Sequence, residues 1–505
     1  MTAADRRIAK RRKDSRAQDN RFRLAGRSVR LERDEGFVAV RFRDDLPREE
    51  WAQAVEAVHG LLPFETRREV PGERVTLLAV TPAGLGGPGA AAALASLGQR
   101  SEVARAMPVF LVEDSRVVPT GRVILRFRAG APVGALLKTH GLALVEQCGE
   151  LVVAGTPVEA DVFEACRLLL GEWMVLRAEP DFVAFGPLTT APRARLQEGR
   201  RPVPETYALP LVRARQAQDL VAGRPGIRVA ILSDGIDAGH PDLAGTVVGR
   251  YEALRATRSP WNWHGTACAG LVAGRGAIAE GIRGVAPGCT LLDVRIGRVE
   301  PSRSHWMTGV AAICRGIEWS WREAGAAVIL LGWSETLESP EIREVIEEAR
   351  TQGRDGRGCV IVAAAGDRPG PVPFPGSLPN LLTVTAGNAF DEAKSAWTRD
   401  GETGWGCAFG PQVGLMAPGV QLVTAAHGGG HVSFGGSAAA AAIVAGACAL
   451  VLSVRPRMTE AELRELLGAT ADPVGQHRYA GGRNDYCGQG RVNVLEAVEA
   501  ARALC

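Results

Sequence analysis

The chain has 505 residues, of which 46% are hydrophobic, 23% charged and 5% aromatic. These proportions are typical of folded globular proteins and exclude a disordered or fibrous chain. The 59 lysine and arginine residues nearly balance the 56 acidic residues, and a net charge of +3 gives no indication of a polyanionic partner for the whole molecule. A length above that of one ordinary hydrophobic core predicts several domains.

Residues 1–27 are polar and contain a basic cluster between Arg6 and Lys13. We interpret this segment as a solvated, disordered tail, and a contact of the cluster with nucleic acid or an anionic membrane is the weaker alternative. The tail lacks the apolar core of a secretory signal, and no apolar run in the chain is expected to span a bilayer. We therefore expect a cytoplasmic protein that contacts neither nucleic acid nor membrane, with leaderless export as the alternative.

Residues 28–184 repeat two short patterns, first as FVAVRFR and VARAMPVF and again as RVILRFR and VLRAEPDF. The first pattern alternates apolar and polar residues, as half-buried strands do, and helical spacing follows at residues 48–59 and 90–97. The order β-α-β-β-α-β predicts two small ferredoxin-like α+β units, residues 28–112 and 113–184.

Residues 185–206 are rich in proline, arginine and glycine without periodicity, which predicts an exposed linker. The remaining residues, 207–505, alternate helical patterns with short apolar runs. The clearest runs are residues 226–232, 326–332, 358–366 and 381–387. Continuous apolar strands separated by helices predict a mainly parallel sheet buried on both faces. Ligand-binding groups in such sheets lie at the carboxyl ends of the strands.

Distinctive motifs stand at these strand ends. They are VAILSDGID at residues 229–237, followed by HPDL, HGTACAGLVAG at 264–274, AAAGD at 363–367 and SFGGSAAAAAIVAG at 433–446. Together they resemble the subtilisin-like serine proteases, the subtilase clan, across residues 207–505. The resemblance implies an α/β, three-layer domain that hydrolyses peptide bonds with an Asp, His and Ser triad. It also implies that the α+β units are similar to the family's pro-region, a folding chaperone and inhibitor.

The chain departs from the family at three of the positions to which the resemblance assigns a catalytic role. His264 matches the family's histidine. Ser233 stands in place of the orienting aspartate, Ala438 in place of the nucleophilic serine, and Asp367 in place of the oxyanion-hole asparagine. Without a nucleophile the acyl-enzyme cannot form. We therefore predict an inactive homologue that acts by binding a peptide or protein, with its own N-terminal units as one candidate ligand.

Two alternatives stay open. A shifted triad of Asp234, His264 and Ser437 would make the chain an active serine endopeptidase. That triad requires a bulge at Ser233 and an extra residue in a continuous helical pattern, and one inserted residue rotates all later helical residues by about 100°. In the other alternative the N-terminal units are a protein-interaction or inhibitor module carried by an inert scaffold.

The segment LLGWSE is similar to the substrate-binding strand of the family and contributes Leu331, Gly332, Trp333 and Ser334. We expect its main chain to pair with an extended peptide by strand addition. The bulky indole of Trp333, where the family often has leucine, would alter or fill the specificity pocket.

His427 and His431 have the spacing of metal ligands within the glycine-rich run HGGGH. The sequence reveals no third ligand beside them, and structural or catalytic zinc sites use at least three protein ligands. We therefore interpret the run as a hairpin and expect no metal site and no cofactor.

Overall fold

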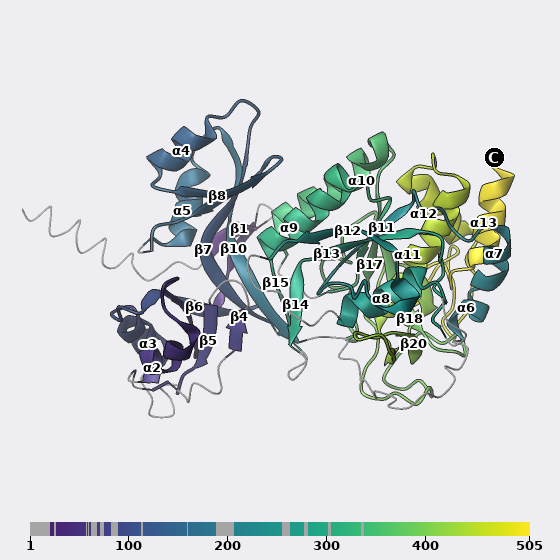
Figure 1. Cartoon of the computed structure of the whole chain (residues 1–505), viewed down its shortest axis with the longest axis horizontal. Coiled ribbons are helices and arrows are strands. Elements are labelled where there is room, and N and C mark those ends of the chain that lie inside the picture. Colours follow the sequence, from purple (N-terminus) through teal and green to yellow (C-terminus); the bar gives the residue numbers. More distant parts are fainter. Residues whose placement is uncertain are drawn as a thin grey trace, which may run out of the picture. The chain divides into compact units, whose positions relative to one another are not determined.

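A computed structural model of the chain describes residues 21–24, 27–56, 58, 60–61, 68–70, 75–81, 89–112, 115–158, 160–187, 207–254, 263–276, 281–300, 305–334 and 338–504. The basic cluster Arg6–Lys13 and residues 188–206 of the predicted linker lie outside these residues. The chain divides into two compact units, which are drawn in Figure 1. Unit 1 is Met1–Ala184 with Ser339–Glu341, and unit 2 is Phe185–Glu338 with Ile342–Cys505.

Unit 1 begins with a short antiparallel pair, β1 (Arg21–Leu24) and β2 (Arg27–Arg30), so regular structure already exists where the sequence predicted the end of a tail. The first repeat then follows in the predicted order. Its elements are β3 (Glu32–Phe42), η1 (Arg48–Glu50), α2 (Trp51–Glu56), β4 (Arg68–Val70), β5 (Val75–Ala79), α3 (Gly89–Leu97) and β6 (Val103–Val112). Val38, Val40 and Phe42 share a buried cluster with Trp51 and Leu97. Both helices therefore cover the same face of β3, because residues spaced by two point to one side of a strand.

The second repeat has the same order. Its elements are β7 (Ser115–Phe127), α4 (Val133–Thr139), β8 (Ala143–Cys148), β9 (Leu151–Gly155), α5 (Val162–Leu169) and β10 (Val175–Pro187). The long strand β7 pairs antiparallel with β6 through residues 115–117 and with β9 through residues 122–126. The two repeats are therefore joined into one sheet, which the sequence repeat alone did not predict.

Unit 2 is built on a sheet with the strand order β12-β13-β11-β16-β17-β18-β19, and neighbouring strands pair in parallel. The strands are β11 (Arg228–Ser233), β12 (Val247–Glu252), β13 (Thr290–Arg295), β16 (Val328–Leu331), β17 (Val360–Ala364), β18 (Leu382–Gly387) and β19 (Val413–Pro418). All residues of β13, β16, β17 and β18 are buried. This burial explains the unbroken apolar runs and confirms the predicted parallel α/β fold.

Helices cover both faces of this sheet. They are α6 (Ala208–Leu211), α7 (Ala214–Leu220), α8 (Trp263–Ala273), α9 (Val310–Glu318) with η5 (Trp319–Glu323), α10 (Pro340–Gly356), α11 (Ser437–Val454), α12 (Glu460–Ala469) and α13 (Val494–Ala503). Ile231 of β11 belongs to the buried cluster of α8 and α11. Its neighbour Leu232 lies 3.7 Å from a Cβ placed on Gly316 of α9. Since neighbouring strand residues point to opposite faces, α9 and α11 form separate outer layers.

Short elements connect the layers. The turn η4 (Pro241–Leu243) follows β11, and two antiparallel hairpins are formed by β14 (Gly297–Glu300) with β15 (His305–Gly309) and by β20 (Leu422–Ala425) with β21 (His431–Phe434). The second hairpin leads directly into α11, so its position fixes where that helix begins.

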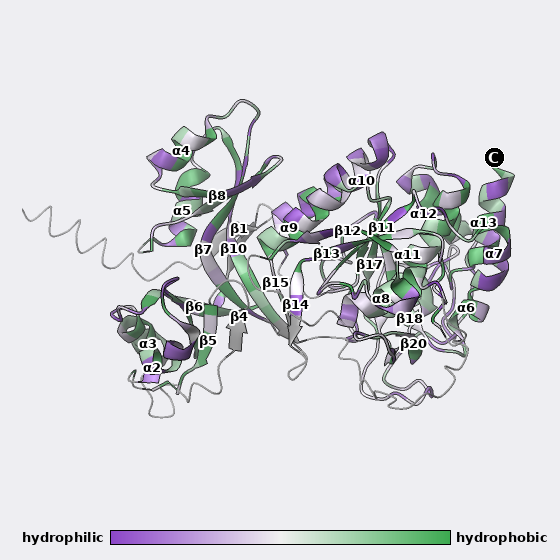
Figure 2. Cartoon of the chain, viewed as in Figure 1, coloured by the Kyte–Doolittle hydropathy of each residue, from purple (hydrophilic) through white to green (hydrophobic). Residues whose placement is uncertain are grey.

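Helix α11 is the central helix of unit 2. In the described part of the chain it is the one helix that is long and apolar enough to cross a membrane by length and composition, which corrects the expectation that no such run exists. Of the residues Ser437–Val454, 94% are buried within the protein. Figure 2 shows hydrophobic residues along the central strands of unit 2 and hydrophilic residues along α10. The burial of α11 is that of a core helix.

Candidate functional site at the carboxyl ends of the central strands

Ser233 is the last residue of β11 and Asp234 follows it, and both are buried. The Asp234 carboxylate accepts hydrogen bonds from the main-chain amides of His264, at 3.3 Å, and Gly265, at 2.8 Å. These amides belong to the first turn of α8, where unpaired N–H groups attract an acceptor. Burial raises the pKa of Asp234 to about 7, against the opposing effect of the two amides. Asp234 therefore caps the start of α8.

Gly265 allows the end of β11 and the start of α8 to approach closely. A Cβ atom at this position would collide with the Ser233 hydroxyl and the Gly235 carbonyl oxygen. The Ser233 hydroxyl accepts a hydrogen bond of 3.3 Å from the amide of Gly235. Ser233 thus lies beside the helix that carries His264, but its side chain brings no negative charge.

His264 lies in the first turn of α8 and is buried. Its ring packs edge-to-face against Trp263 and Phe434, with centroid distances of 5.6 and 5.5 Å. The Nδ1 atom lies 4.0 Å from Cys268 Sγ, one helical turn later. Burial lowers the pKa of His264 to about 4, so the imidazole is neutral at pH 7.

Ala438 and Gly332 complete the surroundings of the histidine. A Cβ placed on Gly332 would lie 3.3 Å from His264 Cε1, 3.7 Å from Ala438 Cβ and 3.8 Å from Cys268 Sγ. The strand end after β16, the start of α11 and the start of α8 therefore meet at one point. The side chain that α11 presents at this point is the methyl group of Ala438.

Asp367 caps the start of α11 through the amide of Ser437. The Ser437 amide donates to Asp367 Oδ1 at 2.7 Å, and the Gly366 amide donates to the Ser437 hydroxyl at 3.0 Å. Burial raises the pKa of Asp367 to about 6, although both hydrogen bonds from Ser437 oppose this. The other carboxylate oxygen, Oδ2, is buried and has no hydrogen-bond partner among the described residues. These contacts hold Ser437 against the loop that follows β17.

The predicted peptide-binding segment follows β16. Leu331 is buried in the strand, and Trp333 is only 7% exposed. The indole Nε1 atom of Trp333 is buried without a hydrogen-bond partner in the described part of the chain. Ser334 lies next to the loop of Asp367, since its hydroxyl is 3.3 Å from a Cβ placed on Gly366. Between described residues, no main-chain hydrogen bond involves Trp333 or Ser334.

The loop histidines do not act as the pair that their spacing suggested. His427 lies 3.7 Å from Asp237, whereas His431 Nε2 lies 3.3 Å from Asp242 Oδ2. His240, Asp242 and His431 each offer a ligand atom, and these atoms lie within 4.8 Å of one another. His240 and Asp242, which belong to the HPDL motif far earlier in the chain, therefore lie beside His431, a proximity that the sequence did not reveal.

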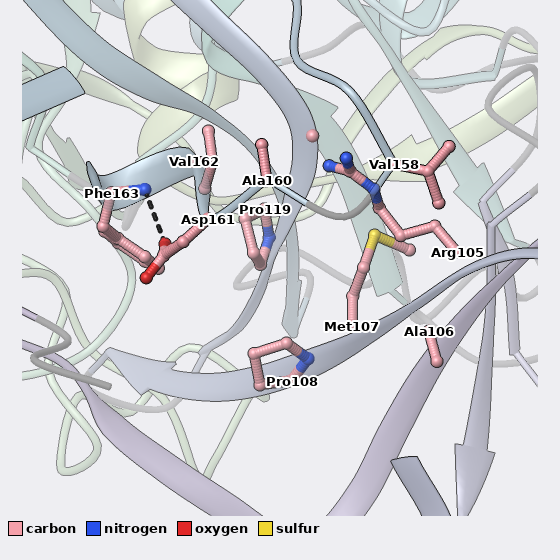
Figure 3. A pocket seen from close by; sticks show the side chains of 11 residues that line it. Arg105, Ala106, Met107, Pro108, Pro119, Val158, Ala160, Asp161, Val162 and Phe163 are labelled. Atoms are coloured by element: carbon pink, nitrogen blue, oxygen red, sulfur yellow. Dashed lines mark hydrogen bonds between the residues drawn. The ribbon is translucent and has the colours of Figure 1, made fainter. Parts of the chain in front are cut away.

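Unit 1 contains a cavity that the sequence did not indicate. Its volume is about 200 Å³, and it lies between β6, β7 and the start of α5 (Figure 3). The Arg105 guanidinium on its wall donates to the Thr156 hydroxyl at 3.2 Å and to the Pro157 carbonyl oxygen. Asp161 accepts from the Phe163 amide at 2.9 Å and caps α5. The polar side chains Arg105 and Asp161 of the cavity wall thus have hydrogen-bond partners within unit 1.

Residues 224–490 match the model of the subtilase family, peptidase S8. Thermitase from Thermoactinomyces vulgaris is 30% identical over 296 residues, which cover 58% of this chain and 95% of thermitase. A calcium-dependent protease from Nostoc sp. is 31% identical over 320 residues, which cover 55% of this chain. The chain spans 46% of the length of that protease.

Among solved structures, fervidolysin from Fervidobacterium pennivorans is described as a keratinolytic enzyme related to subtilisin. It is similar to this chain with a TM-score of 0.56 and a sequence identity of 20%, over 75% of this chain and 61% of fervidolysin. At this identity the similarity concerns the fold.

Proposed function

The chain belongs to the subtilase family, and we propose that it has lost peptide-bond hydrolysis and binds an extended peptide or protein segment instead. The observation that carries this proposal is the methyl side chain of Ala438 beside His264. A serine protease forms a covalent acyl-enzyme through a hydroxyl that the histidine deprotonates. A methyl group has no acidic proton for the histidine to remove and no lone pair with which to attack.

The surroundings of His264 support the same proposal. The carboxylate of Asp234 accepts from main-chain amides of α8, and Ser233 is uncharged. A catalytic histidine needs a carboxylate that stabilises its imidazolium form. Burial instead lowers the pKa of His264 to about 4, so this imidazole is a weak base. Since triad members act as a unit, the loss of one removes most of the contribution of the others.

Asp367 is also unsuited to catalysis. An oxyanion hole consists of hydrogen-bond donors directed at developing negative charge. With a pKa of about 6, Asp367 is mostly ionised at pH 7, and its Oδ1 already accepts from the Ser437 amide. A carboxylate at this place would repel an oxyanion.

Peptide binding is supported by the segment after β16. Main-chain groups in proteins are normally hydrogen-bonded. The N–H and C=O groups of buried Trp333 and half-buried Ser334 have no main-chain partner among the described residues. An extended peptide supplies matching N–H and C=O groups by strand addition. The buried indole of Trp333 occupies the space beside this segment, which favours a ligand with small side chains there.

A fluorophosphonate probe, which labels activated serines, tests the loss of catalysis. We expect no labelling of the purified full chain and no change in Ser437→Ala. The double variant Ala438→Ser with Ser233→Asp should gain labelling, because it restores the missing hydroxyl and carboxylate. Labelling of the wild-type chain that disappears in Ser437→Ala would establish the shifted triad of Asp234, His264 and Ser437 instead.

Peptide binding is tested separately, by fluorescence anisotropy with a pool of fluorescein-labelled hexapeptides. We expect saturable binding that weakens when Ser334→Pro distorts the segment and its main-chain pairing. The variant Ser395→Pro, in the loop between β18 and β19, is a control for a proline introduced elsewhere. Equal binding by both variants would show that the segment after β16 is not the docking strand.

A further inference from the structure

Three side chains with metal-binding atoms converge where the β20–β21 hairpin meets the HPDL motif. They are His240 and Asp242 of that motif and His431 at the start of β21. We propose that these three residues bind a divalent transition-metal cation of the zinc class. The site lies outside the groups that replace the catalytic triad and does not depend on whether the cleft is active.

The distances fit such a cation. His431 Nε2 and Asp242 Oδ2 are 3.3 Å apart. A tetrahedral zinc ion bound at about 2.0–2.1 Å separates two of its ligand atoms by about 3.4 Å. The pair is therefore already spaced for a cation between them. All three ligand atoms lie within 4.8 Å of one another, so a small side-chain movement brings the third into place.

His240 is oriented as metal-binding histidines are. Its Nε2 lies 2.7 Å from the Gly430 carbonyl oxygen, and its Nδ1 accepts from the Asp242 amide at 3.1 Å. An acceptor at Nδ1 places the proton on Nε2, which then donates to the carbonyl. Metal-binding histidines usually donate their other ring N–H to a carbonyl or carboxylate in this way. The cation would take the place of the Asp242 amide at Nδ1.

Burial and ligand chemistry narrow the class of cation. The side chain of Asp242 is fully buried and that of His431 is 20% exposed, so the site has a buried inner group and one side open to water. A water molecule can thus provide a fourth ligand. Two imidazoles with one carboxylate suit zinc and its neighbours in the transition series, whereas calcium and magnesium prefer sites made of oxygen atoms.

Cobalt(II) titration of the chelator-treated full chain tests the site, because four-coordinate cobalt absorbs visible light and zinc displaces it. We expect one cobalt ion per chain, released by zinc, and an increase in the unfolding temperature with zinc. His431→Ala should weaken binding by more than about tenfold, the loss seen even when only the partner of a ligand is removed. This variant should also lose the zinc-dependent increase in unfolding temperature.

The control is His427→Ala, which removes the other histidine of the same hairpin but lies against Asp237. It should bind cobalt as the wild-type chain does. No binding by the wild-type chain, or equal binding by His431→Ala, would overturn the proposal. Near-ultraviolet charge-transfer bands of cobalt bound to thiolate would also overturn it, since they would assign the metal to the free cysteines.

Discussion

Two buried carboxyl groups, Asp234 and Asp367, influence how the stability of unit 2 depends on pH. Burial raises the pKa of Asp234 from 3.8 to about 7 and that of Asp367 to about 6. Between the ordinary and the raised values, the folded protein holds a proton that the unfolded chain releases. Their contribution to stability is therefore complete below pH 4 and is lost as the pH rises towards 7. His264, whose pKa burial lowers to about 4 from 6.5, acts in the opposite direction across that range.

The variant Asp234→Asn removes one of these titrations. We expect the decline in the free energy of unfolding between pH 5 and pH 8 to shrink by on the order of 2 kcal/mol, because the buried group no longer loses a proton. Urea unfolding at a series of pH values measures this decline. An unchanged slope in Asp234→Asn would contradict the prediction.

At the scale of residues, the sequence could identify the positions that correspond to catalytic groups but not the hydrogen-bond partners of those residues. The motif around His264 and the ungapped segment around Ala438 indicated which residues correspond to the catalytic groups of the family. That Asp234 and Asp367 each cap a helix could not be predicted, since each cap depends on atoms from a segment distant in the sequence. For the same reason the sequence did not predict that His240 and Asp242 lie close to His431.

At the scale of elements, the contact between α8 and the end of β11 depends on Gly265. The variant Gly265→Ala forces a Cβ atom into the Ser233 hydroxyl and the Gly235 carbonyl, so the helix must move. We expect a loss of about 1–3 kcal/mol in the free energy of unfolding, as for other overpacked sites. Gly226→Ala is the matched control, because a Cβ there has nothing within 4 Å. Equal unfolding midpoints in urea for the two variants would show that the close approach is not required.

The apolar runs predicted several strands of unit 2 closely. The run at residues 226–232 became β11 (Arg228–Ser233), and the run at 381–387 became β18 (Leu382–Gly387). Such strands can be predicted from the sequence because burial on both faces requires apolar residues throughout. The joining of the two repeats through β7 could not be predicted. The pairing of residues 115–117 with β6 depends on strand register and not on composition.

At the scale of the whole molecule, the proposed loss of catalysis has a consequence for processing. An active family member with a pro-region would remove it by its own reaction, whereas we expect this chain to remain whole. Protein produced alone with host proteases inhibited should have the intact mass of all 505 residues. A cut within residues 188–206 that disappears in Ser437→Ala would instead demonstrate activity of the shifted triad.

The single strand β7 holds both repeats of unit 1, since residues 115–117 pair with one repeat and residues 122–126 with the other. A pulling force applied along unit 1 would load both repeats through the same backbone segment. The β6–β7 pairing at residues 115–117 lies across the boundary between the repeats, so it must break before the repeats can separate. Although its sequence is duplicated, unit 1 should therefore resist separation of its repeats through a continuous sheet and not only through the chain that links them.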